Sequence, residues 1–145
     1  ILCAFISNNM VNLNDYIINK TALLGNIEKI RRYIGYGTKL CAVVKADAYG
    51  LGVKNVCPII NDDVDYYAVV SVMEALELRK IIKQKPILVL GACNLNYANE
   101  CAKNDIDLTI SSIDEVKFLN ENLESVLKVH LKINLITSFI QRKLI

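Results

Sequence analysis

One lysine in this chain of 145 residues has the surroundings that covalent chemistry needs. Lys45 follows the apolar run at residues 40–44, and Gly50 and Gly52 come shortly after it. A lysine that attacks an aldehyde reacts as the free amine, so it must be desolvated or lie near another cation, and be held rigidly. The end of a buried strand, followed by a glycine-containing turn, can provide that setting. From the residues alone, a lysine that merely snorkels at a strand end is an equally good interpretation.

The segment from Ala42 to Gly52 reads AVVKADAYGLG. It resembles the pyridoxal 5'-phosphate attachment motif of alanine racemases. The resemblance implies that Lys45 forms an aldimine with pyridoxal phosphate and acts as a catalytic base. It also implies that Tyr49 contacts the cofactor phosphate and that Leu90 lines the cofactor ring. An ordinary strand-core role for Leu90 predicts the same packing.

The resemblance covers residues 10–134, which we expect to form the N-terminal part of an alanine racemase-like barrel that binds pyridoxal phosphate. Within it, residues 86–91 are similar to the family's third barrel strand. Residues 1–9 form an N-terminal extension without an assigned role. The tail at residues 135–145 departs from the family pattern.

Lys132 lies in a segment, residues 130–134, that is similar to the family's fifth strand. In several alanine racemases the matching lysine is carbamylated, and the resemblance implies this role for Lys132. The other interpretation stays open: Lys132 is one more polar position on the solvated face of an alternating strand. Phe139 stands where the family has a substrate-positioning arginine, and we do not transfer that role to Arg142.

Composition indicates a globular domain, with 53% hydrophobic and 22% charged residues and a net charge of +2. Basic residues do not cluster with aromatic ones, so we expect neither a nucleic-acid nor a membrane partner. Apolar runs stay well below the roughly 20 residues of a membrane span. We expect a cytoplasmic location and free thiols at the five cysteines. With one histidine, His130, and no C-x-x-C, we expect no metal site.

Apolar periodicity predicts alternating strands and helices. Two capping boxes of the form Ser-x-x-Glu, at Ser71 and Ser112, mark helix starts. We expect helices at residues 14–34, 52–61, 71–83, 95–103 and from 112 onward, and strands at residues 40–45, 66–70, 87–90, 106–110 and 126–134.

Several side chains are assigned to the core at this stage. We expect the strand at residues 40–45 to be buried on both faces, as parallel strands under helices are. Met73, Leu76 and Ile81 should face inward from their helix, and Val116 should do so from the last one. Pro58 should shorten or kink the helix that contains it.

The predicted fold class is α/β: a partial (β/α)8 TIM barrel with about five of its eight strands, since a complete barrel takes about 250 residues. A doubly wound nucleotide-binding sheet would want a G-x-G-x-x-G pattern after the first strand, which the chain lacks. The preference for the barrel follows from the resemblance.

The resemblance also implies a function: a racemase that interconverts L- and D-alanine, with alanine as substrate and a homodimer as the full-length enzyme. Racemisation needs a base on each face of the substrate. Lys45 is one, and the partner subunit would supply the other, so we expect the isolated chain to be inactive. Two alternatives stay open: a pyridoxal-phosphate-binding module without racemase activity, and a non-functional remnant of a broken reading frame. The sequence does not distinguish alanine from serine or a broader substrate.

Overall fold

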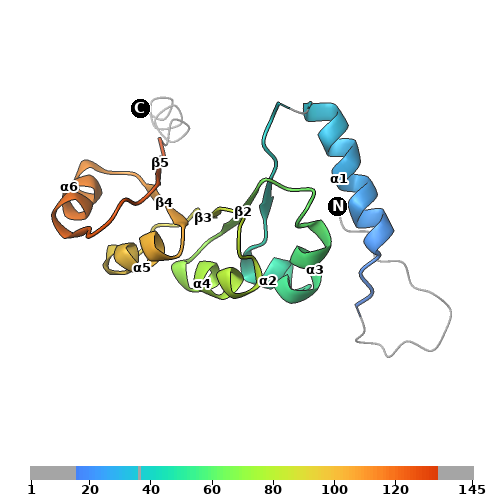
Figure 1. Cartoon of the computed structure of the whole chain (residues 1–145), viewed down its shortest axis with the longest axis horizontal. Coiled ribbons are helices and arrows are strands. Elements are labelled where there is room, and N and C mark those ends of the chain that lie inside the picture. Colours follow the sequence, from blue (N-terminus) through green and yellow to red (C-terminus); the bar gives the residue numbers. More distant parts are fainter. Residues whose placement is uncertain (1–15, 36, 134–145) are drawn as a thin grey trace, which may run out of the picture.

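The computed structural model describes residues 16–35 and 37–133, which form one parallel sheet with helices along it (Figure 1). Its strands follow each other in chain order, and all neighbouring pairs are parallel. They are β1 (Cys41–Val43), β2 (Tyr66–Val69), β3 (Ile87–Val89), β4 (Ile106–Ile110) and β5 (Val129–Leu131). The predicted fold class, α/β with five strands of a partial TIM barrel, is confirmed.

Helices alternate with these strands, as the periodicity predicts. They are α1 (Lys20–Ile34), α2 (Lys45–Tyr49), α3 (Val53–Ile60), α4 (Val72–Ile81), the 3₁₀ turn η1 (Leu95–Tyr97), α5 (Ala98–Lys103) and α6 (Ile113–Asn122). In Figure 1, α2, α3, α4 and α5 lie along the same side of the sheet. The other face of the strands is the one that a complete barrel would enclose.

The core lies between the sheet and this row of helices. Alternate strand residues such as Tyr67, Val69, Ile87 and Val89 are almost completely buried there, as the two-residue period of a strand requires. The hydroxyl of the buried Tyr67 donates a hydrogen bond to the carbonyl oxygen of Cys57 in α3, at 3.1 Å. A buried polar group is thereby satisfied without leaving the core.

Both capping boxes are present. The Ser71 hydroxyl accepts from the Glu74 N–H, and the Ser112 hydroxyl accepts from the Glu115 N–H, each at 3.2 Å. The helices α4 and α6 therefore begin where the pattern predicts.

The prediction that the first strand is buried on both faces is wrong. Cys41 is exposed and the Val43 side chain is 40% exposed. The reason is that β1 is an edge strand of the described sheet and pairs only with β2. The strand also ends at Val43, so Lys45 lies just beyond its carboxyl end and is the first residue of α2.

Two other element boundaries differ from the prediction. Helix α1 begins at Lys20 because the Asn19 side chain accepts a hydrogen bond from the Ala22 N–H at 2.9 Å and caps it. The expected start at residue 14 lies outside the described residues. Strand β5 covers three residues, where the pattern predicted nine.

The predicted inward faces of two helices are also corrected. Met73 is 58% exposed, while Val72, Ala75 and Leu78 are buried, because α4 turns that stripe toward the sheet. In α6, Leu119 is buried and Val116 is 42% exposed. Helix α3 contains Pro58 and ends two residues after it, at Ile60.

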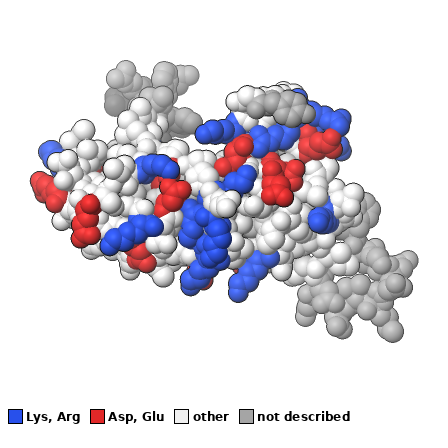
Figure 2. All heavy atoms as spheres, in the orientation of Figure 1, with Lys and Arg blue, Asp and Glu red and all other residues white. Residues whose placement is uncertain are grey.

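Charged side chains of both signs are spread over the face shown in Figure 2. The Arg31 guanidinium donates hydrogen bonds to the carbonyl oxygens of Thr38 and Asp63 and to the Asp65 carboxylate.

Among the cysteines, burial raises the pKa of the Cys57 thiol to about 11. Within the described ranges, we find no helix that is long and apolar enough to cross a membrane.

Candidate active site

Lys45 lies at the carboxyl end of β1. The strand ladder continues up to it, since the Val44 N–H donates to the carbonyl oxygen of Ala68 at 2.8 Å. Lys45 is half-buried, and its Nζ lies 6.0 Å from the centroid of the Tyr49 ring. The two residues that the sequence singled out are therefore neighbours in space, within the range of a cation–π contact.

The residues between Lys45 and Gly50 form a left-handed turn. Their φ angles are 50° at Ala46, 52° at Asp47, 54° at Ala48 and 57° at Tyr49. Left-handed helical backbone costs an L-residue about 1–2 kcal/mol, so four in succession store considerable strain. The sequence predicted a tight turn from the glycines, whereas the unusual conformation begins at Ala46.

Several hydrogen bonds hold this turn. The Ala48 N–H donates to the carbonyl oxygen of Val44 at 3.0 Å, and the Gly52 N–H donates to that of Asp47 at 2.8 Å. The Asp47 carboxylate accepts from the Val53 N–H at 2.7 Å, which ties the turn to the first residue of α3. Ala48, a residue of the turn, is buried, so its packing stabilises the turn in addition to these hydrogen bonds.

A further bond reaches the turn from a distant part of the chain. The Glu74 carboxylate accepts the Ala46 N–H through Oε1 at 2.8 Å. Its other oxygen, Oε2, accepts the N–H groups of Val70 and Ser71 at 2.8 and 3.2 Å. Burial raises the pKa of the Glu74 carboxyl, but these hydrogen bonds and the positive charge of Lys45 outweigh it and hold that pKa below its usual range.

Leu90 follows the last residue of β3 and extends the ladder, with its N–H donating to the carbonyl oxygen of Val69 at 2.8 Å. The strand registers pair Val43 with Ala68 and Ala68 with Leu88. Val43, Ala68 and Leu88 therefore lie in one row on the face away from the helices, and Leu90, two residues after Leu88, lies on the same face. The Leu90 side chain is 36% exposed there.

Lys132 is not near Lys45 in the described structure. It follows β5, where its N–H donates to the carbonyl oxygen of Ile110 at 2.8 Å, and it is exposed. Strands β1 and β5 are the opposite edges of the sheet. The structure thus brings Lys45 and Tyr49 together, puts Leu90 at the carboxyl end of β3 in the same sheet, and leaves Lys132 at the far edge.

A buried polar cluster on the helix-free face was missed by the sequence reasoning. Asp107 is only 2% exposed, accepts a hydrogen bond from the Tyr66 hydroxyl, and lies 3.2 Å from Nε2 of His130. The pKa of Tyr66 is raised by burial and by this carboxylate. Three strands contribute one residue each, so only the alternating pattern of β4, with a charge between Ile106 and Leu108, could have indicated it.

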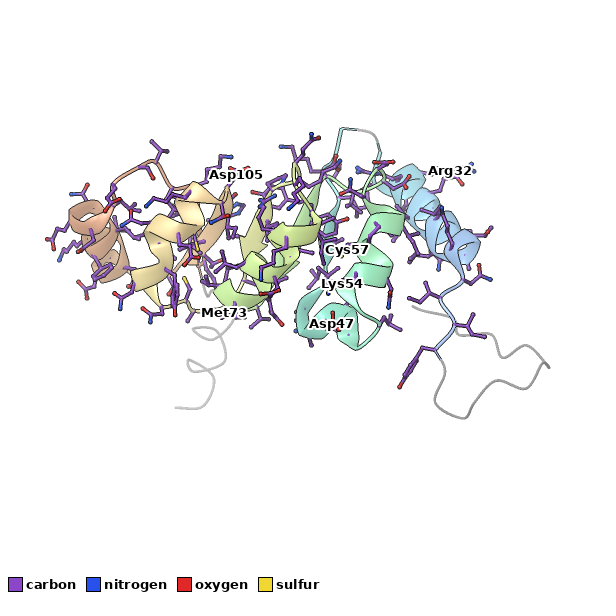
Figure 3. The ribbon with its side chains drawn as sticks, turned by 60° about the horizontal axis from the view of Figure 1, so that its bottom comes forward. Arg32, Asp47, Lys54, Cys57, Met73 and Asp105 are labelled. Atoms are coloured by element: carbon purple, nitrogen blue, oxygen red, sulfur yellow. The ribbon has the colours of Figure 1, made fainter. Side chains whose placement is uncertain are left out.

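A groove of about 850 Å³ lies on the helical side between α2, α3 and α4. Asp47, Lys54 and Met73 come from these three elements and are labelled in Figure 3. Glu74 also lines this groove, but Lys45 does not.

The residue types at the candidate site fit pyridoxal phosphate. Lys45 offers an amine that can bond to an aldehyde, and Tyr49 offers a hydroxyl that can donate to a phosphate oxygen. Leu90 offers exposed apolar surface at the carboxyl end of β3, against which an aromatic ring can pack.

Comparisons with known proteins identify the family to which the chain is similar. Residues 18–137 match the family described as alanine racemase, N-terminal domain. The serine/alanine racemase of Enterococcus gallinarum is 42% identical over 95 residues, 65% of this chain and 14% of that protein. The alanine racemase of Francisella philomiragia subsp. philomiragia is 34% identical over 125 residues, 84% of this chain and 34% of that protein.

Solved structures show the corresponding fold. The alanine racemase from Bacillus anthracis with bound L-Ala-P is 32% identical with a TM-score of 0.71, over 77% of this chain and 30% of that one. The alanine racemase from E. faecalis is 29% identical with a TM-score of 0.74, over 79% of this chain and 32% of that one.

The chain spans about a third or less of the length of these relatives. The division into residues 1–9, 10–134 and 135–145 stays a prediction, because both of its boundaries lie outside the described residues. The family match, however, covers most of the chain. The chain belongs to the alanine racemase family, within its N-terminal domain.

Proposed function

We propose that this chain is the cofactor-binding part of a pyridoxal-phosphate-dependent racemase that interconverts L- and D-alanine. One observation carries the proposal: Lys45 lies just beyond the carboxyl end of β1, half-buried, with Tyr49 beside it, and Leu90 lies at the carboxyl end of β3 in the same sheet. In barrels of this class the carboxyl ends of the strands are where active sites lie.

Each of the three residues has a distinct task. Lys45 would hold the cofactor through its Nζ, which can react with an aldehyde, and its free amine would remove or return the Cα proton on one face of the substrate. The Tyr49 hydroxyl would donate to the phosphate, and Leu90 would pack against the ring. When bound, pyridoxal phosphate withdraws electrons from Cα and so makes its proton removable.

Both interpretations of Lys132, a carbamylated lysine and an ordinary solvated position, stay open. Its position after β5 is compatible with a carbamylated lysine that faces a closed barrel interior, since it has the same strand parity as His130. It is equally compatible with an ordinary solvated lysine. We therefore build no step of the reaction on it.

Alanine is the proposed substrate because alanine racemases dominate the relatives described above. One of those relatives is a serine/alanine racemase, so a second small amino acid is the nearest competitor. A homodimer with the second base on the partner subunit, and a cytoplasmic location, stay predictions from the resemblance.

The cofactor-binding module without racemase activity remains the second candidate for the isolated chain. One observation favours it: the residues assigned here serve cofactor binding and one face of the substrate. The edges β1 and β5 are also exposed, with Val43 40% and Leu131 67% exposed. We expect the isolated chain to bind pyridoxal phosphate, to associate through these edges and to leave L-alanine unchanged.

The test is to add pyridoxal phosphate to the 145-residue chain, reduce with borohydride and locate the labelled lysines by peptide mass spectrometry. The result expected is a label concentrated on Lys45, which disappears in Lys45→Ala and persists in Lys54→Ala. Lys54 is an exposed lysine of the neighbouring α3 and serves as a matched control. An even distribution of label over the surface lysines would contradict the assignment.

A further inference from the structure

The turn that follows Lys45 cannot be stable through its own sequence preferences. Ala46, Asp47 and Ala48 all have φ and ψ angles between 46° and 54°, where alanine and aspartate pay a steric cost. Glycine would adopt this conformation freely, but the first glycine after Lys45 is Gly50. Contacts from outside the turn must therefore stabilise it.

Glu74 supplies such a contact at the point where the turn begins. The N–H of Ala46 belongs to the peptide bond that Lys45 and Ala46 share, and it donates to Glu74 Oε1 at 2.8 Å. The other carboxylate oxygen holds the N–H groups of Val70 and Ser71. One side chain thus joins the backbone next to Lys45 to the end of the adjacent strand β2.

The second capping box shows that this connection is not a general property of the motif. Glu115 has the same place in its box, and its Oε2 accepts the N–H groups of Ser111 and Ser112 at 2.6 and 2.9 Å. These bonds, like the one from the Ser111 hydroxyl, stay within four residues of Glu115. The bond from Glu74 to Ala46 spans 28 residues.

We propose that Glu74 is a positioning residue: by holding the Ala46 N–H, it fixes the left-handed turn and sets where the Lys45 amine lies. This inference rests on the proposed function of Lys45 but adds a residue to it. A capping glutamate alone would need only its bonds to residues 70 and 71. The additional bond places the start of the turn in fixed relation to the ends of both β1 and β2.

The first experiment measures the geometry without cofactor. Amide hydrogen exchange of the full chain should show protection of Ala46 falling about tenfold in Glu74→Ala, as expected for a lost bond to a charged group. Ser71→Ala removes the hydroxyl half of the same capping box and leaves the carboxylate bonds in place, so Ala46 should stay protected. Equal loss of protection in both variants would show that only the helix cap matters and would overturn the inference.

The second experiment measures the effect on Lys45. Borohydride labelling is compared at equal folded fraction, using the ratio of label at Lys45 to label at Lys54 within each molecule. We expect the ratio to fall about tenfold in Glu74→Ala and to stay unchanged in Glu115→Ala, which loses a capping box without a connection to the turn. If Glu74→Ala does not fold, Glu74→Gln replaces it, with Glu115→Gln as its control. A glutamine offers one oxygen and cannot keep both sets of bonds.

The outcomes separate the two proposals. Even labelling of the lysines in the unaltered chain overturns the proposed function, and with it the role of Glu74. Selective labelling of Lys45 that persists in Glu74→Ala overturns the positioning role and leaves the proposed function intact. Selective labelling that is lost in Glu74→Ala and kept in Glu115→Ala and Ser71→Ala supports both.

Discussion

The carboxyl ends of β1–β3 and those of β4 and β5 carry the same local motif but are connected differently. Both regions contain a Ser-x-x-Glu capping box with both of its reciprocal bonds. In the first region, Glu74 binds Ala46 after β1 as well as Val70 after β2. In the second, the bonds of Glu115 stay local.

The third strand joins the first region through a close backbone approach. The Gly91 N–H donates to the carbonyl oxygen of Val70 at 3.2 Å. The ends of β1, β2 and β3 are thus bonded to one another around Lys45. The same sequence motif therefore only begins a helix in one region, while in the other it also bonds to a distant segment, depending on what faces its second carboxylate oxygen.

The largest effect is expected from Gly91→Ala. A Cβ at this position would lie 2.4 Å from the carbonyl oxygen of Val70, a backbone atom that cannot move away alone. We expect a loss of about 1–3 kcal/mol in the free energy of unfolding, measured by urea denaturation. Gly25→Ala in α1 is the control: nothing lies within 4 Å there, and removing a helical glycine should stabilise by about 0.5–1 kcal/mol. Equal effects of the two substitutions would contradict the close approach.

The losses in the free energy of unfolding that follow from removing each of the two glutamates should differ by a smaller amount. Glu115→Ala removes a helix cap, which costs about 0.5–2 kcal/mol, and Glu74→Ala should cost about 1 kcal/mol more because the Ala46 N–H also loses its partner. Urea denaturation of both variants at neutral pH checks the order, and a larger loss in Glu115→Ala would break the comparison.

Acid should remove the difference between these variants. Hydrogen bonds from Ser111 and Ser112 lower the pKa of Glu115. Burial raises the pKa of Glu74, but its backbone hydrogen bonds and the charge of Lys45 outweigh burial and lower that pKa. A carboxyl whose pKa is lowered by folding contributes stability above its unfolded pKa and loses it as pH falls through the folded pKa. The two variants should therefore converge with the unaltered chain below the usual range of a glutamate. Convergence on the alkaline side instead would contradict the assignment.

The smallest effect concerns the handedness of the turn. Ala46→Gly relieves left-handed strain of about 1–2 kcal/mol but makes the unfolded chain more flexible, so the net change should be stabilising by less than about 1 kcal/mol. Ala22→Gly in the right-handed α1 should instead destabilise by about 0.5–1 kcal/mol. Opposite signs in thermal melts would confirm the left-handed backbone. A loss at both positions would argue against it.

Features with a local period or cap were predictable from the sequence. The five strands and the boxes at Ser71 and Ser112 follow from short-range patterns, whereas the pairing of Lys45 with Tyr49 at one site came from the resemblance to alanine racemases. The left-handed turn was not predictable, because alanine and aspartate carry no local signal for positive φ. Contacts between distant parts of the chain were also beyond the sequence: Glu74 with Ala46 and Asp107 with His130 join residues that are more than 20 positions apart.

The exposed faces of β1 and α4 were mispredicted for a related reason. A run of apolar residues indicates a strand, but whether both of its faces are covered depends on its neighbours in the sheet, and β1 pairs with β2 alone. The inward stripe of α4 likewise depends on how the helix is rotated against the sheet, which places Met73 outside.

The most direct test of the account is a crystal structure of the chain, in its full-length protein where that is obtained, after addition of pyridoxal phosphate and borohydride reduction. The account predicts electron density continuous from the Nζ of Lys45 to the cofactor, with the phosphate at the Tyr49 hydroxyl and the ring against Leu90. Cofactor bonded to another lysine, or a phosphate held away from Tyr49 with Lys45 unmodified, would contradict it.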